Sequence, residues 1–145
     1  MLGGLRVNRL VPAKAELAQN WPPALARVAL TSPFLLSAAL KAADFPAAEA
    51  EVRALTGLEP ASVIAALVIV VQLGGSLLLL LGGRRAWIGA GLLAGFTFVA
   101  TLTAHAWWTK LPAEAPQDLA IFWEHVAICG GLLLAAWLSW RERAR

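Results

Sequence analysis

A few polar side chains interrupt stretches of the sequence that are otherwise apolar, and these are the residues best suited to chemistry. They are Lys41, Gln72, His105, Glu124 and His125. Histidine titrates near neutrality, and a carboxyl group partly removed from water is pushed toward the same range. We therefore expect a pocket that exchanges protons with an amphipathic redox molecule such as a quinone, whose polar head needs hydrogen-bond donors and acceptors.

Each of these residues also has a purely structural interpretation. Lys41 is suited to anchoring a helix at the membrane interface, paired with Asp44 three residues later, and Glu124 to a rim position balanced by Lys41 or Lys110. The two histidines could supply interhelical hydrogen bonds. Bis-histidine haem ligation is the weakest alternative, because nothing else in the sequence marks a haem site.

The composition excludes a water-soluble globule. Of 145 residues, 59% are hydrophobic and 14% charged, against about 45–50% and about 25% in ordinary soluble domains. A single cysteine and two histidines exclude a disulfide framework and a zinc finger. The net charge is +3 and the basic residues gather at helix ends, which excludes nucleic-acid binding. No nucleophile, metal set or nucleotide motif favours catalysis by this chain alone.

The excess of apolar residues indicates that the protein is embedded in lipid. A bilayer core needs roughly 20 apolar helical residues to cross it, and four stretches fit, at about 24–43, 61–82, 86–108 and 119–140. Residues 1–23 form an N-terminal segment, interfacial or cytoplasmic, and 141–145 a tail. The first span begins after Pro22-Pro23, since prolines suit a first helical turn. A cleavable signal peptide is the competing interpretation of that span. It is disfavoured because the segment before Arg27 is longer than the charged region of a signal peptide.

Basic residues near spans are retained on the cytoplasmic side, and here they are unevenly divided. One side carries Arg6, Arg9, Lys14, Arg84, Arg85, Arg141, Arg143 and Arg145, whereas the other gathers most of the acidic residues. Both termini are therefore predicted to be cytoplasmic, in a multi-pass protein of the inner membrane. The seven tryptophans agree, because Trp21, Trp87, Trp137 and Trp140 fall at the inner face and Trp107, Trp108 and Trp123 at the outer one.

This topology predicts where the polar residues lie. Lys41, His105, Glu124 and His125 share a level near the outer face, with Gln72 deeper. Ser37 lies one turn below Lys41. Thr97, Thr101 and His105 recur every fourth residue and are predicted to form a stripe that faces inward, and the two threonines are expected to bond back to carbonyls of their own helix.

Small residues predict the helix contacts, because close backbone approach drives association in lipid. Gly91 and Gly95 form a GxxxG pair, and paired glycines recur at 74–75, 82–83 and 130–131. Pro33 should bend the first span. A short interfacial helix over 47–56 is also expected before Gly57 and Pro60. A homo-oligomer is compatible with the sequence.

Several short motifs, in this order, resemble the DoxX family of small four-span membrane proteins. They are SAALK over 37–41, QLGG over 72–75, HAW over 105–107 and FWEHVAICGG over 122–131. The resemblance runs from about residue 25 to 138. Two positions depart from the family pattern, since Gln72 stands where a glutamate is usual and Glu124 where a lysine is usual.

The resemblance implies an all-α bundle of four transmembrane helices. It also implies association with membrane oxidoreductases, because the family's namesakes are membrane subunits of quinone-linked sulfur-oxidising complexes. Two hypotheses follow. The chain is an accessory subunit that contacts quinone near the outer face beside an oxidoreductase partner, or it is a non-catalytic scaffold or small-solute carrier without a redox role.

Overall fold

The computed structural model describes the backbone of residues 12–143 and the side chains of residues 24–141. Long helices follow one another with short connections. They are α1 (Pro12–Ala43), α2 (Phe45–Thr56), α3 (Ala61–Leu81), α4 (Ala86–Ala104) and α5 (Ala115–Arg143), with short 3-10 helices η1 (Gly83–Arg85) and η2 (Trp107–Thr109). Residues 12–143 contain no strand.

The four predicted spans are present as helices long and apolar enough to cross a membrane. They cover Ala24–Ala43, Ala61–Leu81, Gly83–Thr109 and Ala115–Arg141. Large apolar side chains such as Leu36, Val70 and Phe98 are more than half exposed on their outer surfaces, which suits contact with lipid rather than water. The chain is an all-α, multi-pass membrane protein.

Several helix boundaries differ from the prediction. α1 begins at Pro12 and continues through Pro22-Pro23, so these prolines interrupt hydrogen bonds without ending the helix. α4 ends at Ala104, before the predicted 108, because His105 leaves helical geometry with φ −119° and ψ 39°. α5 begins at Ala115, before the predicted 119, where Pro116 suits the first turn.

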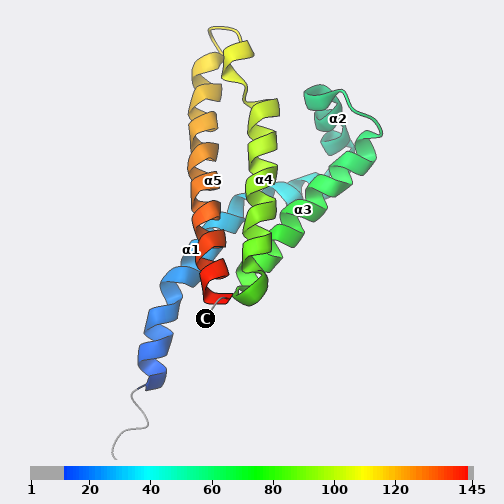
Figure 1. The fold of residues 1–145 in the computed structure, drawn as a ribbon. Coiled ribbons are helices and arrows are strands. Elements are labelled where there is room, and N and C mark those ends of the chain that lie inside the picture. Colours follow the sequence, from blue (N-terminus) through cyan, green and yellow to red (C-terminus); the bar gives the residue numbers. More distant parts are fainter. Residues whose placement is uncertain (1–11, 144–145) are drawn as a thin grey trace, which may run out of the picture.

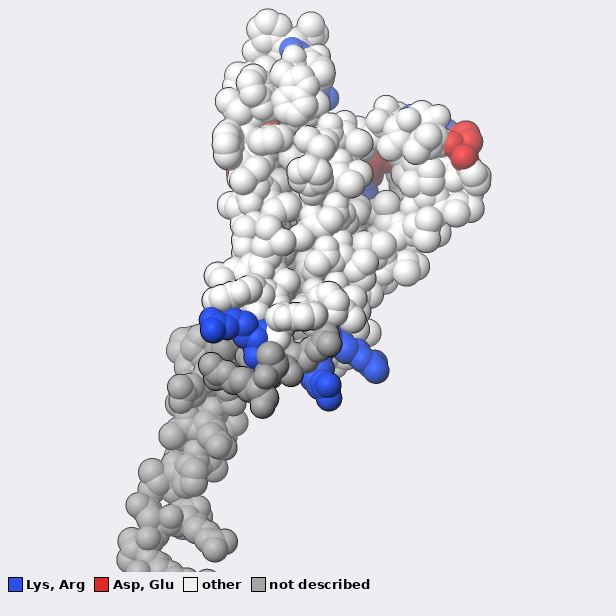
Figure 2. Space-filling model, in the orientation of Figure 1, with Lys and Arg blue, Asp and Glu red and all other residues white. Residues whose placement is uncertain are grey.

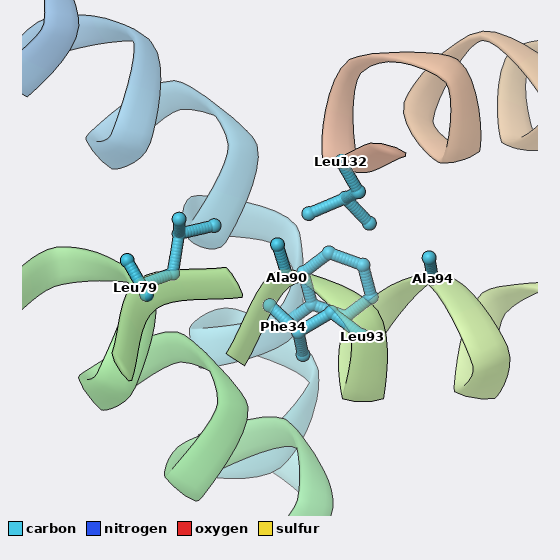
Figure 3. Packing of buried hydrophobic residues seen from close by; sticks show 7 residues of the cluster. Phe34, Leu79, Ala90, Leu93, Ala94 and Leu132 are labelled. Atoms are coloured by element: carbon cyan, nitrogen blue, oxygen red, sulfur yellow. The ribbon is translucent and has the colours of Figure 1, made fainter. Parts of the chain in front are cut away.

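α4 is the central helix of the bundle. It packs against α3 on one side and α5 on the other, while α1 packs mainly against α3 and passes behind α4 and α5 (Figure 1). The buried core lies where these helices meet. Phe34 from α1, Leu79 from α3 and Leu132 from α5 gather around Leu93 and the alanines of α4 (Figure 3).

The close contact between α3 and α4 is made by Gly75, which belongs to a predicted pair, and by Gly89, which was not predicted, and not by the GxxxG pair. A Cβ atom added to Gly89 would lie 2.5 Å from the carbonyl oxygen of Gly75, whereas one added to Gly91 or Gly95 would meet nothing within 4 Å. The GxxxG pair therefore faces away from α3, and the helices pack through Gly75 and Gly89. Closely approaching backbones of this kind stabilise contacts between membrane helices.

Charges and tryptophans mark the two ends of the bundle. Figure 2 shows basic side chains concentrated at the lower end, a largely uncharged surface above them and an acidic patch in the region of α2 and the loop that follows it. At the arginine-rich end the Arg27 guanidinium lies against Gly82, and the Trp87 and Trp140 rings are 5.0 Å apart. At the other end the Trp107 and Trp108 rings are 5.9 Å apart. The Trp21 side chain lies outside the described residues.

α2 is the predicted short helix between the first two spans. Asp44 caps its first turn, with Oδ1 accepting a hydrogen bond from the Ala47 backbone nitrogen at 3.1 Å. Gly57 ends it in the left-handed conformation, at φ 65°, which glycine adopts without steric penalty. α2 contacts α3 and, less extensively, α1 and α4, so it covers one end of the bundle.

Candidate functional site

A cavity of about 280 Å³ opens among the helices at the end away from the arginine cluster. All five α-helices contribute to its wall. The lining residues include Pro33, Phe34, Ser37, Lys41, Glu51, Leu55, Gln72, Phe96, Thr97, His105, His125 and Ile128. Its interior combines aromatic and aliphatic side chains with a small number of polar ones, which is typical of small-molecule sites.

Lys41 bonds to Glu51 of α2 and not to the predicted Asp44. Its Nζ donates a hydrogen bond to Glu51 Oε2, and the lysine side chain is 19% exposed. Asp44 caps α2 instead. The Lys41–Glu51 pair therefore joins the end of α1 to α2 at the wall of the cavity.

Gln72 lies deeper and is 2% exposed. Its Nε2 donates to Ser37 Oγ at 3.1 Å, which links α3 to α1. Its Oε1 is buried without a hydrogen-bond partner among the described residues, and so is the Ser76 hydroxyl one turn later. A buried acceptor without a partner is costly, so this oxygen favours a ligand or a water that can donate to it.

His105 is the first residue after α4 and bonds to the first turn of α5. Its Nδ1 lies 2.7 Å from Asp118 Oδ1, and the Lys110 Nζ approaches the other carboxylate oxygen at 3.9 Å. The side chains of His105 and Asp118 are 24% and 17% exposed. An ionised carboxylate accepts only, so Nδ1 of His105 carries the proton of this hydrogen bond.

His125 projects from α5 toward α4. Its Nδ1 lies 3.0 Å from the Thr101 hydroxyl, and its ring centroid is 5.2 Å from that of His105, with the ring planes at 71°. A haem bound by both histidines would need its porphyrin between the rings. The two rings contact each other edge to face, which leaves no such gap.

The threonine stripe faces inward as predicted. Thr97 and Thr101 are buried, and each donates to a carbonyl of its own helix, Leu93 at 2.8 Å and Thr97 at 2.6 Å. Each threonine therefore uses its single hydroxyl proton in a bond to its own helix. Thr101 can therefore only accept from His125.

The structure brings four of the five sequence-predicted residues to the cavity wall and leaves out Glu124. Glu124 is exposed and is not among the lining residues. Neighbouring positions on a helix project about 100° apart, and His125 occupies the inward direction. Neither Lys41 nor Lys110 balances the Glu124 carboxylate, because these lysines contact Glu51 and Asp118.

Two carboxylates at the site were missed. Asp118 precedes His125 by two helical turns, so the period of α5 places both on one face, and this signal was available in the sequence. No comparable signal in the sequence pointed to Glu51, because its position depends on how α2 folds back over the bundle. The candidate site therefore has two polar clusters, Lys41–Glu51 and Asp118–His105–His125, with Gln72 below them.

The loop after α2 is fastened by a charged contact outside the membrane-spanning segments. Glu59 accepts from the Ala61 backbone nitrogen at 2.8 Å and from Arg53 Nε at 2.6 Å. The Ala61 bond, followed by Arg53, lowers the pKa of Glu59, and Glu59 in turn raises the pKa of Arg53. This contact helps to hold α2 over the cavity.

Comparison with known proteins gives one match. A family model described as DoxX matches residues 23–106, which include Lys41, Gln72 and His105 but end before Asp118 and His125. No curated protein and no solved structure matches the chain.

Proposed function

Since this chain belongs to the DoxX family, we propose that it is an accessory subunit of a quinone-linked membrane oxidoreductase. It binds the quinone head in the cavity near the outer face, while a partner protein carries the electrons. It lies in the inner membrane with both termini in the cytoplasm. The single observation that carries this proposal is the grouping of two imidazoles, an ammonium and a buried amide around one cavity between membrane helices.

The chemistry of this wall suits a quinone head. Such a head is a flat ring with an oxygen at each end, and it needs hydrogen-bond partners on both sides. His105, just after α4, and His125 of α5 supply one part of the cavity wall, and Lys41 and Ser37 of α1 supply another part. Phe34 and Phe96, whose ring centroids are 6.3 Å apart, supply apolar surface.

A second, more apolar cavity suits the tail. It has a volume of about 200 Å³ and shares Lys41, Glu51, Leu55 and Phe96 with the first. Its remaining wall is mainly aliphatic and comes from α2, α3 and α4, including Ile64, Val68 and Val99. An isoprenoid chain attached to a head in the first cavity has an apolar path through it.

The charge distribution supports the proposed orientation. The arginine-rich end, with Arg84 and Arg85 in η1 and Arg141 stacked 4.7 Å from the Trp137 ring, is the cytoplasmic one under the positive-inside rule. The cavity then lies near the external face, because it opens at the opposite end.

A binding experiment tests this function. The protein is purified into lipid nanodiscs and titrated calorimetrically with decylbenzoquinone. We expect saturable binding that weakens about tenfold or more in His105→Ala and His125→Ala, since each removes a hydrogen-bonding group. Glu124→Ala is the matched control, because this polar residue of α5 lies off the cavity. Undiminished binding in both histidine variants contradicts the proposal.

The alternative functions give different results. A scaffold retains a redox partner during purification in mild detergent whether or not the histidines are present, and binds no quinone. A small-solute carrier produces solute flux when the protein is reconstituted into liposomes. An ultraviolet-visible spectrum of the purified material detects a flavin or haem partner directly.

A further inference from the structure

Resting on the proposed function, we propose that the cavity selects the reduced, dihydroxy form of the ring over the oxidised, dicarbonyl form. A hydroxyl can donate and accept a hydrogen bond, whereas a carbonyl oxygen can only accept. Discrimination therefore depends on acceptors in the cavity wall that have no donor of their own. His125 and Gln72 both present such atoms.

The hydrogen bonds of α4 fix the tautomer of His125. Thr101 gives its hydroxyl proton to the Thr97 carbonyl at 2.6 Å, and a carbonyl has no proton to return. The 3.0 Å contact between Thr101 Oγ1 and His125 Nδ1 therefore requires the proton on Nδ1. In the neutral imidazole Nε2 is then a bare acceptor, and no residue in the described part of the chain donates to it.

Gln72 supplies a second acceptor at greater depth. One N–H of its Nε2 donates to Ser37 Oγ at 3.1 Å, and the amide oxygen is buried without a hydrogen-bond partner among the described residues. The side chain is 2% exposed and lines the cavity. A ligand hydroxyl that reaches this oxygen can donate a hydrogen bond to it, whereas a ligand carbonyl oxygen at the same place would repel it.

His105 adds a third acceptor whenever its ring is neutral. Asp118 accepts from Nδ1 at 2.7 Å, which leaves Nε2 as a lone pair. The hydrogen-bond partner of His105 is a carboxylate, whereas the partner of His125 is a neutral hydroxyl. The preference of the cavity for the reduced ring does not depend on His105.

The donors in the wall do not cancel this preference. Lys41, paired with Glu51, and the Ser37 hydroxyl can each donate to the ligand. A ligand hydroxyl oxygen accepts such a bond as a carbonyl oxygen does. Donors therefore serve both forms of the ring, whereas each bare acceptor serves only the reduced form.

A difference in affinity changes the potential of the bound couple. If the reduced form binds about tenfold more tightly, the midpoint potential of the bound two-electron couple rises by about 30 mV. A quinone held in this cavity is then a stronger oxidant than the same quinone free in the membrane. This direction suits a subunit that receives electrons from an oxidoreductase partner.

Separate titrations with the two forms test the proposal. Wild-type protein in nanodiscs is titrated anaerobically with decylbenzohydroquinone and with decylbenzoquinone. We expect the hydroquinone to bind about tenfold more tightly, because one unpaired buried acceptor has a cost of this order. Equal affinities, or tighter binding of the quinone, overturn this inference and leave the proposed function standing. Failure of both forms to bind overturns both.

Variants locate the source of the preference. Gln72→Met removes an acceptor while conserving volume, and Thr101→Val removes the group that fixes the His125 tautomer. Each should lower the affinity for the hydroquinone relative to that for the quinone, because each removes or frees an acceptor that repels a carbonyl oxygen. The matched control is Thr109→Val, which removes a threonine that bonds to the Ala106 carbonyl away from the cavity. A preference unchanged in both test variants overturns the inference.

The tautomer can be read without a variant that might disturb folding. The chain contains two histidines, so a ¹⁵N spectrum of histidine-labelled protein has two rings to assign, and His105→Gln assigns them. We expect His125 to be protonated at Nδ1 and bare at Nε2. A wild-type His125 protonated at Nε2 alone overturns the argument directly.

Discussion

The Nδ1 atom of His105 lies 2.7 Å from Oδ1 of Asp118, so the residue that ends α4 is bonded to the first turn of α5. This contact closes the α4–α5 hairpin at the cavity. It also sets the direction of the His105 ring, which in turn contacts the ring of His125. One hydrogen bond thus connects the stability of the hairpin to the arrangement of the site.

Asp118 is a positioning residue, and its removal should affect binding through His105. We expect Asp118→Ala to destabilise the protein by about 1–3 kcal/mol, because it leaves a partly buried imidazole without its charged partner, and to weaken quinone binding about as much as His105→Ala does. Thermal unfolding and titration in nanodiscs measure the two effects. The double variant with Asp118→Ala and His105→Ala should lose little more stability or binding than either single variant.

The control for this position is Glu114→Ala, which removes an exposed carboxylate from the same loop. It should change neither stability nor binding. If Asp118→Asn, which can still accept a hydrogen bond, fails to restore part of the binding lost in Asp118→Ala, the positioning role is contradicted.

The α3–α4 interface should tolerate no side chain at Gly89. An added Cβ would lie 2.5 Å from the Gly75 carbonyl oxygen and 2.8 Å from the Leu79 backbone nitrogen, and backbone atoms cannot rotate away. We expect Gly89→Ala to destabilise the protein by about 1–3 kcal/mol or more. Gly91→Ala, two residues later where nothing lies within 4 Å, is the control, and it should leave stability unchanged or slightly raised.

These two variants are compared by thermal unfolding in the same detergent. Equal melting temperatures would mean that α3 and α4 do not meet at Gly89. A loss confined to Gly91→Ala would instead indicate that the outward GxxxG pair forms a contact between copies of the chain.

The loop after α2 should loosen in acid. The pKa of Glu59 is lowered by the Ala61 backbone bond and by Arg53, so the ionised carboxylate stabilises the folded loop at pH above the ordinary glutamate pKa of about 4.3. That contribution is lost as the pH falls through the lowered pKa. A spin label at Leu58→Cys, in a Cys129→Ala background, should become more mobile as the pH is lowered from neutral to below the lowered pKa of Glu59.

Glu59→Gln provides the comparison for this loop. The neutral amide cannot form the charged contact with Arg53, so the label should already be mobile at neutral pH and change little on acidification. A label whose mobility is independent of pH in the presence of Glu59 would show that this contact does not hold the loop.

The same labelled position tests the orientation in the membrane. Leu58 is exposed in the loop between α2 and α3, and Arg85 lies at the opposite end in η1. A membrane-impermeant maleimide should modify Leu58→Cys in intact cells, whereas Arg85→Cys should react only after permeabilisation. The reverse pattern would place the cavity near the cytoplasm and contradict the proposed topology.

The sequence predicted the spans well because charge and length leave little freedom in lipid. α3 ends at Leu81, one residue from the prediction. The end of α4 and the start of α5 were less predictable, since His105 leaves helical geometry early and α5 begins early at Ala115, with Pro116 in its first turn. Those boundaries depend on local capping, which hydropathy does not report.

The candidate site was predictable in part for a similar reason. Depth along a span placed Lys41, His105 and His125 at one level with Gln72 deeper, and the structure puts all four around one cavity. Depth does not determine the direction in which a side chain points around its helix. The predicted site therefore included Glu124 and left out Asp118, which lies two turns before His125. Glu51 depends on the packing of α2, which no spacing in the sequence encodes.

The central claim is that a quinone head occupies the cavity between Lys41 and the two histidines. The most direct measurement is photolabelling with an azido-substituted quinone in nanodiscs, followed by peptide mapping. The account predicts modification of residues 33–41, 96–105 and 125–128, suppressed by excess unlabelled decylbenzoquinone. Labelling confined to the lipid-facing groove along Gly91 and Gly95, or labelling that excess quinone does not suppress, would contradict it.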